Sequence, residues 1–170
     1  MTLSPQIADL EIILADDDVD DCYFFKEALK ESNVSTKLTV VEDGEQLVYL
    51  LKNNHDTVPD VIFLDLNMPR KNGFECLSEI KTDKRLNQIP VVVYSTSFHK
   101  EIATMLYING ANYYISKPSD ISILKNVVQK MIHLIANGNS EQPQMENFLL
   151  TIEQKNAKAL VWFKEFFTFP

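Results

Sequence analysis

Four apolar stretches of this sequence each run into polar residues that could do chemistry. The groups that follow them are carboxylates, hydroxyls and one ammonium. They are Asp16, Asp17 and Asp18 after "LEIILA", Asp65 after "VIFL", Ser95 and Thr96 after "VVVY", and Lys117 after "YYIS". A charged carboxylate is costly inside a buried strand, so an aspartate at the open end of such a strand is better placed for a reaction.

These groups match the requirements of phosphoryl transfer. Several carboxylates brought together would repel each other and raise each other's pKa. Bound Mg²⁺ would remove that conflict, because it takes oxygen ligands from one or two carboxylates and leaves room for a phosphoryl group. Lys117 could pair with Asp65 or with phosphate oxygens, and the Ser95 hydroxyl could donate to the same oxygens. The set predicts aspartyl-phosphate chemistry with a carboxylate nucleophile, a metal and a stabilising cation.

The elements that must position these groups alternate along the chain. We expect strands at 10–15, 37–42, 60–65, 90–95 and 112–116, and helices at 19–32, 45–54, 74–83, 99–109 and 119–136. Apolar strands that are each followed by a helix predict an α/β fold with a parallel sheet covered on both faces. Right-handed crossovers make this an open, doubly wound five-stranded sheet, with functional groups at the carboxyl ends of the strands.

The remaining segment lies outside this alternation. Residues 137–144, "NGNSEQPQ", predict a linker, and the apolar residues that follow lie near one helical stripe. That stripe comprises Met145, Leu149, Ile152, Ala159, Leu160, Phe163 and Phe167. We therefore expect one domain over 8–137, then a linker and C-terminal amphipathic helical extension over 138–170. A tail this short cannot form a separate output domain, so we expect it to pack on the domain or on a second copy.

The composition of the chain excludes several classes of protein. The chain has 170 residues, 45% of them apolar, and a net charge of −8. That charge argues against a nucleic-acid surface, which needs clustered Lys and Arg. Two cysteines, Cys22 and Cys76, are too few for a disulfide framework. No signal peptide and no apolar run of membrane-spanning length is evident, so we expect a cytoplasmic protein without membrane contact.

The four motifs together resemble the bacterial response-regulator receiver domain of two-component systems. The matching residues are "ILADDD", "FLDLNMPRKNG", "YSTS" and "YYISKP", in that order over residues 10–118. The resemblance implies a flavodoxin-like fold with strand order 2-1-3-4-5. The ending "VWFKEFFTFP" is similar to that of stand-alone, phytochrome-associated regulators.

The resemblance also implies roles for the acidic residues. Asp65 would accept a phosphoryl group from a histidine kinase or phosphotransfer protein. Asp16 and Asp17 would hold Mg²⁺ together with Asp65, and Asn67 would add its backbone carbonyl. The protein would not be an enzyme beyond its self-phosphorylation and autodephosphorylation.

Further implied roles concern the switch. Ser95 would be the switch hydroxyl, Tyr114 the switch aromatic and Lys117 the phosphate contact. The peptide bond before Pro118 would be cis, which only X-Pro bonds allow cheaply. The output would be a protein contact, including a possible homodimer through the face of the fourth helix, fifth strand and fifth helix, or through the C-terminal extension.

Other interpretations of the same residues remain open. Asp65 could simply cap the next helix, and Asp18 is expected to cap the first one. Asp20 and Asp21 predict a solvated helix face. A strand-end aspartate also serves phosphohydrolases of the haloacid-dehalogenase type, but these want a second acid two residues on, where this chain has Asn67. A third possibility is an interaction module that works without phosphorylation.

Overall fold

The computed structural model describes residues 9–54, 57–96, 99–152 and 160–162. Its sheet has the strand order β2-β1-β3-β4-β5-β6-β7, so the expected order 2-1-3-4-5 and the parallel pairing of these five strands are confirmed. The strands are β1 (Leu10–Ala15), β2 (Thr36–Val41), β3 (Val61–Leu64), β4 (Val91–Ser95), β5 (Tyr113–Ser116), β6 (Leu149–Ile152) and β7 (Leu160–Trp162). The helices are α1 (Val19–Lys30), α2 (Gly44–Asn53), α3 (Gly73–Thr82), α4 (Lys100–Ile108) and α5 (Ile121–Ala136), with the short 3₁₀ helix η1 (Met145–Asn147).

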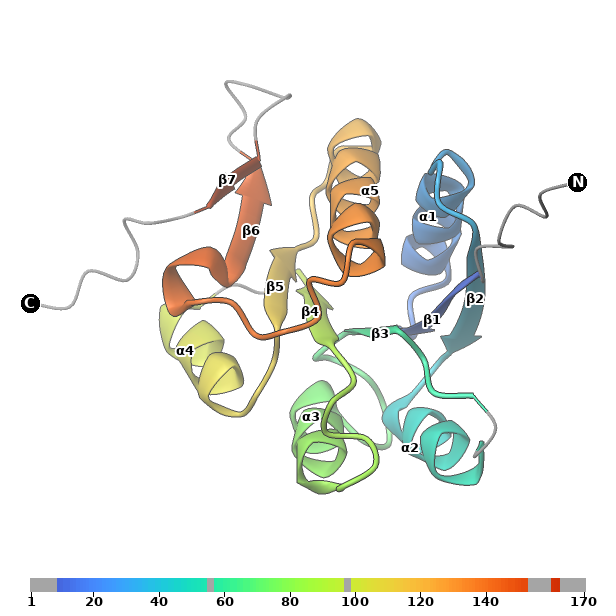
Figure 1. Ribbon diagram of the computed structural model, residues 1–170, viewed down its shortest axis with the longest axis vertical. Helices are drawn as coiled ribbons and strands as arrows, with labels where there is room; N and C mark the ends of the chain where they lie inside the picture. Colours follow the sequence, from blue (N-terminus) through green and yellow to red (C-terminus); the bar gives the residue numbers. More distant parts are fainter. Residues whose placement is uncertain (1–8, 55–56, 97–98, 153–159, 163–170) are drawn as a thin grey trace, which may run out of the picture.

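The sheet lies between two helical layers. Figure 1 shows α1 and α5 on one side of it and α2, α3 and α4 on the other. Successive strand residues point to opposite faces. Ile13 and Ile62 therefore enter the core beneath α2, α3 and α4, whereas Leu14 and Phe63 enter the core beneath α1 and α5. Because both faces of the sheet centre are buried, β3 is wholly apolar and β4 is apolar up to Ser95, whereas the outer strand β2 carries the exposed Lys37.

Side-chain caps start α1 and α3 close to the expected residues. The Asp18 carboxylate accepts hydrogen bonds from the backbone N–H groups of Asp20 and Asp21, which confirms it as the N-cap of α1. Asn72 caps α3 in a capping box with Glu75. Asp65 is thus not the cap of the helix that follows it, and its carboxylate is available for another role.

The expected helical extension is wrong for the described part of residues 138–170. Leu149–Ile152 forms β6, which pairs parallel with β5, and Leu160–Trp162 forms β7, antiparallel to β6. Without β6, β5 would be an edge strand with unpaired backbone groups, and these are satisfied by bonds such as Tyr114 N–H to Phe148 O at 2.9 Å. Ala159, Phe163 and Phe167 lie outside the described residues. The boundary between 137 and 138 stays a prediction.

No helix in these described ranges is both long and apolar enough to cross a membrane.

Lys81 on α3 binds the edge of the sheet at which the parallel strands begin. Its ammonium donates to the backbone oxygen of Ile89 at 2.8 Å and of Asn87 at 3.2 Å, and to Asn112 Oδ1 at 3.3 Å. Burial lowers the pKa of Lys81 from its ordinary 10.5 to about 8. Between these two values the unfolded chain holds a proton that the folded chain has lost.

We therefore expect the free energy of unfolding to rise as pH increases from about 8 to about 10, through this linkage. The measurement is urea unfolding at several pH values, for the wild type and for Lys81→Met. The variant should lack this part of the increase. Equal slopes for the two proteins would show that the folded protein does not depress the pKa of Lys81.

Candidate metal and phosphoryl-acceptor site

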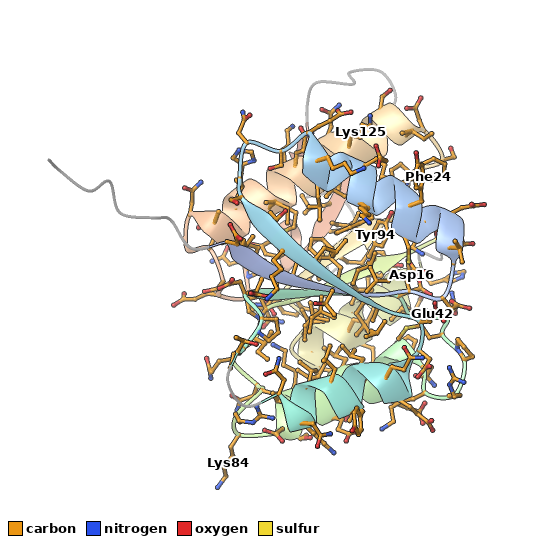
Figure 2. The ribbon with its side chains drawn as sticks, turned by 90° about the vertical axis from the view of Figure 1, so that its right-hand side faces the viewer. Asp16, Phe24, Glu42, Lys84, Tyr94 and Lys125 are labelled. Atoms are coloured by element: carbon orange, nitrogen blue, oxygen red, sulfur yellow. The ribbon has the colours of Figure 1, made fainter. Side chains whose placement is uncertain are left out.

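Two buried aspartates meet at the carboxyl-terminal edge of the sheet. Asp16 follows β1 and Asp65 follows β3, and the neighbouring strands hold them in register through Asp65 N–H to Ala15 O at 2.9 Å. Asp16 is 1% exposed and Asp65 is 5% exposed. Figure 2 shows Asp16 at the end of the sheet where Glu42 also lies, far from Lys84 at the opposite corner.

Asp17 completes an acidic group with these two residues. One carboxylate oxygen from each of Asp16, Asp17 and Asp65 lies within 4.8 Å of the others. Asp17 is exposed, so the group opens to solvent on one side. Three carboxylate oxygens at this spacing fit a hard divalent cation that keeps some of its water ligands. The site could therefore hold Mg²⁺, as the strand-end residues predict.

Lys117 is the cation of the site. Its side chain is 7% exposed, and its ammonium lies 2.6 Å from Asp16 Oδ2 and 3.5 Å from Asp65 Oδ1. The ammonium also lies 4.9 Å from the centre of the Tyr94 ring on β4, which is a cation–π contact. The Tyr94 contact was not foreseen, because strand alternation places this ring on the α1 side but does not tell how far Lys117 reaches.

A further carboxylate was missed in the sequence. Asp21 Oδ2 lies 2.8 Å from the Lys117 ammonium, so the expectation of a solvated face is wrong for this residue. The helical spacing contained a signal. Asp21 lies four residues before Phe25, which is fully buried, so both lie on the face of α1 that points to the sheet.

Burial and charge pull in opposite directions at this site. Burial raises the pKa of Asp16 to about 6, while its hydrogen bond to Lys117 limits the rise. Burial alone would lower the pKa of Lys117, but hydrogen bonds to Asp16 and Asp21 raise it above the ordinary value, so the ammonium stays charged. Together with Asp17 and Asp65, the site then contains four carboxylates and one ammonium. The excess negative charge favours binding of a divalent cation.

This arrangement agrees with comparisons with known proteins. Residues 12–129 match the family described as the response regulator receiver domain. The chain belongs to the response regulator receiver domain family. It is 34% identical over 122 residues to response regulator Rcp1 from Synechocystis, an alignment that covers 69% of this chain and 83% of Rcp1.

Two solved structures extend the similarity to the fold of this receiver domain. The phosphorylated cyanobacterial phytochrome response regulator RcpA matches with a TM-score of 0.72 and 35% identity, over 81% of this chain and 100% of RcpA. The Mn²⁺-bound form of Rcp1 matches with a TM-score of 0.69 and 31% identity, over 75% of this chain and 95% of that one. The similarity to phytochrome-associated regulators is thereby confirmed.

The two candidate switch residues of the receiver domain lie on neighbouring strands. Ser95 ends β4, and its buried hydroxyl has no hydrogen-bond partner among the described residues. Its carbonyl accepts from Lys117 N–H at 2.9 Å. Tyr114 on β5 is fully buried, and burial raises its pKa to about 12. Its ring centroid lies 6.4 Å from that of Phe148, which precedes β6.

Two further predictions concern the loops around the site. Asn67 N–H donates to Asp65 Oδ2 at 2.9 Å, which orients the carboxylate, and the role of the Asn67 carbonyl as a metal ligand stays a prediction. The expected cis bond before Pro118 is wrong, because no peptide bond in the described part of the chain is cis. The trans form is the intrinsically favoured one for X-Pro. With this bond trans, the Lys117 ammonium lies 2.6 Å from Asp16 and 3.5 Å from Asp65.

Proposed function

We propose that this receiver domain works as a phosphorylation-controlled switch in the cytoplasm, with Asp65 as the phosphoryl acceptor. The observation that supports it most is the combination of a buried Asp65 carboxylate, two further aspartates within metal-binding distance and one charged lysine beside them. Receiver domains partner with histidine kinases, and we propose a histidine kinase or phosphotransfer protein as the donor here.

The proposed transfer is an in-line substitution at phosphorus. One Asp65 carboxylate oxygen attacks the phosphorus of a phosphohistidine, the new O–P bond forms, and the N–P bond breaks. The imidazole nitrogen leaves with the electron pair. Asp16, Asp17, Asp65 and the Asn67 carbonyl would hold Mg²⁺, which when bound would neutralise the carboxylates and the incoming phosphate oxygens. Lys117 would contact a phosphoryl oxygen after transfer.

The proposed response begins at Ser95. The phosphoryl group adds charge and acceptor oxygens, and the unpartnered Ser95 hydroxyl gains a bond by moving toward it. That movement vacates space that Tyr114 can fill, which shifts the population between two packings of α4, β5 and α5. Phe148 contacts Tyr114, so the segment that leads into β6 would sense the change. A homodimer through α4, β5 and α5 or through the C-terminal extension stays part of this proposal.

The direct test is uptake of one phosphoryl group from acetyl phosphate, followed by intact-protein mass spectrometry. We expect Mg²⁺-dependent uptake that EDTA abolishes, because without a divalent cation the carboxylates repel an anionic donor. Uptake that continues unchanged in EDTA would contradict the metal role of Asp16 and Asp17. Steady hydrolysis of a chromogenic phosphate ester would instead favour a phosphohydrolase, the alternative that Asn67 in place of an acid disfavours.

A further inference from the structure

The Lys117 ammonium is shared unequally by three carboxylates. It lies 2.6 Å from Asp16 Oδ2 and 2.8 Å from Asp21 Oδ2, both within hydrogen-bond distance. Its separation from Asp65 Oδ1 is 3.5 Å, which exceeds the normal range for an N–H donor. A lysine ammonium has three N–H donors. Two of them are therefore taken by Asp16 and Asp21, and neither is taken by the proposed acceptor.

One of the two close partners, Asp21, holds Lys117 from the side of α1, and the other, Asp16, follows β1 at the edge of the sheet. Asp21 belongs to the first turn of α1, in the layer above the sheet, whereas Asp65 follows β3 within the sheet itself. Asp21 is 32% exposed at its side chain, yet it contacts an ammonium that is only 7% exposed. No other role for the Asp21 side chain is evident in the described structure, because the cap of α1 is supplied by Asp18.

We infer that Asp21 is a positioning residue that holds Lys117 back from Asp65 and so keeps the acceptor carboxylate free. This inference rests on the proposed function. An ammonium in close contact with a carboxylate withdraws the electron pair that must attack phosphorus, so a closer Lys117 would slow transfer to Asp65. After transfer, Asp21 competes with the phosphoryl oxygens for Lys117 and so weakens the contact that stabilises the product.

Loss of Asp21 should therefore slow both the gain and the loss of the phosphoryl group. Without Asp21, Lys117 can move toward Asp65 Oδ1 and make the hydrogen bond that is too long in this structure. In the transfer step, the O–P bond still forms and the bond to the leaving group still breaks, but the attacking Asp65 carboxylate is already hydrogen-bonded to Lys117. In hydrolysis, water attacks the same phosphorus and Asp65 leaves with the electron pair, while a firmer Lys117 contact protects the ester.

The direction of the change in uptake rate distinguishes a positioning role of Asp21 from a general electrostatic effect of its negative charge. Removal of a negative charge near the site would lessen the repulsion of an anionic donor and would speed uptake. The positioning role predicts slower uptake. Asp20 supplies the matched control, since it is the adjacent carboxylate in the same helical turn, is exposed and makes no side-chain contact with Lys117 in the described structure.

The test compares Asp21→Ala with Asp20→Ala in the full chain, with acetyl phosphate and Mg²⁺. For Asp21→Ala we expect the rate of uptake to fall about tenfold and the half-life of the phosphorylated protein to lengthen about fivefold, the scale of one charge-assisted hydrogen bond. Asp20→Ala should stay within about twofold of the wild type in both measurements. Asp21→Glu, which keeps a carboxylate that can accept a hydrogen bond from Lys117, should recover most of the uptake rate.

A readout without phosphoryl transfer comes from NMR. The ¹H–¹⁵N signal of the Lys117 ammonium, assigned by its loss in Lys117→Met, should shift in Asp21→Ala and not in Asp20→Ala. If the wild type takes up the phosphoryl group and Asp21→Ala and Asp20→Ala do so with identical kinetics, the inference is overturned and the proposed function stays intact. An unchanged Lys117 signal in Asp21→Ala would also overturn it. No uptake by the wild type would overturn the proposed function and the inference together.

Discussion

The Asp65→Asn variant is expected to take up no phosphoryl group from acetyl phosphate, with a fall of at least about a thousandfold in rate. An amide oxygen is a far weaker nucleophile than a carboxylate, and no other carboxylate of the site is held in the same position. Asn has almost the same volume as Asp and can still accept the Asn67 N–H that now binds Asp65 Oδ2. Loss of uptake should therefore occur without loss of the fold, as circular dichroism can verify.

Asp60 provides the control for this variant. It lies just before the other end of β3, and its carboxylate accepts the backbone N–H of Glu11 at 2.8 Å. Asp60→Asn keeps an acceptor there and leaves the carboxyl-terminal edge of the sheet unchanged, so it should take up the phosphoryl group at the rate of the wild type. Uptake by Asp65→Asn at a comparable rate would refute the assignment of Asp65 as the acceptor.

The Phe148→Ala variant is expected to lose about 3–5 kcal/mol of its free energy of unfolding. The Phe148 ring is fully buried and packs edge-to-face against Tyr107, with the ring centroids 5.3 Å apart, as well as against Tyr114. Alanine would leave a cavity between α4 and β5, and the lost packing adds to the lost transfer free energy. The measurement is equilibrium unfolding in urea.

Tyr23→Ala is the control for loss of an aromatic side chain. Tyr23 is 57% exposed on α1, so its removal should change the free energy of unfolding by only about 0.5 kcal/mol. A loss below about 1 kcal/mol for Phe148→Ala would mean that the segment before β6 does not belong to the core. The comparison thus tests whether the C-terminal extension is an integral part of the receiver sheet.

Much of the fold could be predicted because it depends on local pattern. Uninterrupted apolar runs such as "VIFL" and "VVVY" can only be buried strands when amphipathic helices alternate with them. The expected strand and helix limits agree with the structure to within about two residues, the usual uncertainty of such limits. The prediction of a helical C-terminal extension failed because the structure of this segment depends on tertiary contacts. Its apolar spacing fits a helix, but the exposed edge of β5 offers backbone hydrogen bonds that a helix cannot use.

The candidate site divides in the same way. That Asp16 and Asp65 lie together follows from the sequence, since each ends an apolar strand and parallel strands end at one edge. That Asp21 and Tyr94 also contact Lys117 does not follow, because a lysine chain is long and its path depends on side chains from three separate elements.

The sequence by itself thus determined the alternating architecture and the acidic edge, because hydrophobic periodicity and strand direction are local properties of the chain, whereas the strand order was implied by the resemblance to the receiver domain. Only the tertiary structure decided where the Lys117 ammonium lies among its carboxylates and that residues 149–152 extend the sheet. These depend on distances between residues far apart in the chain, which are fixed by packing and by the need to pair buried charges and backbone groups.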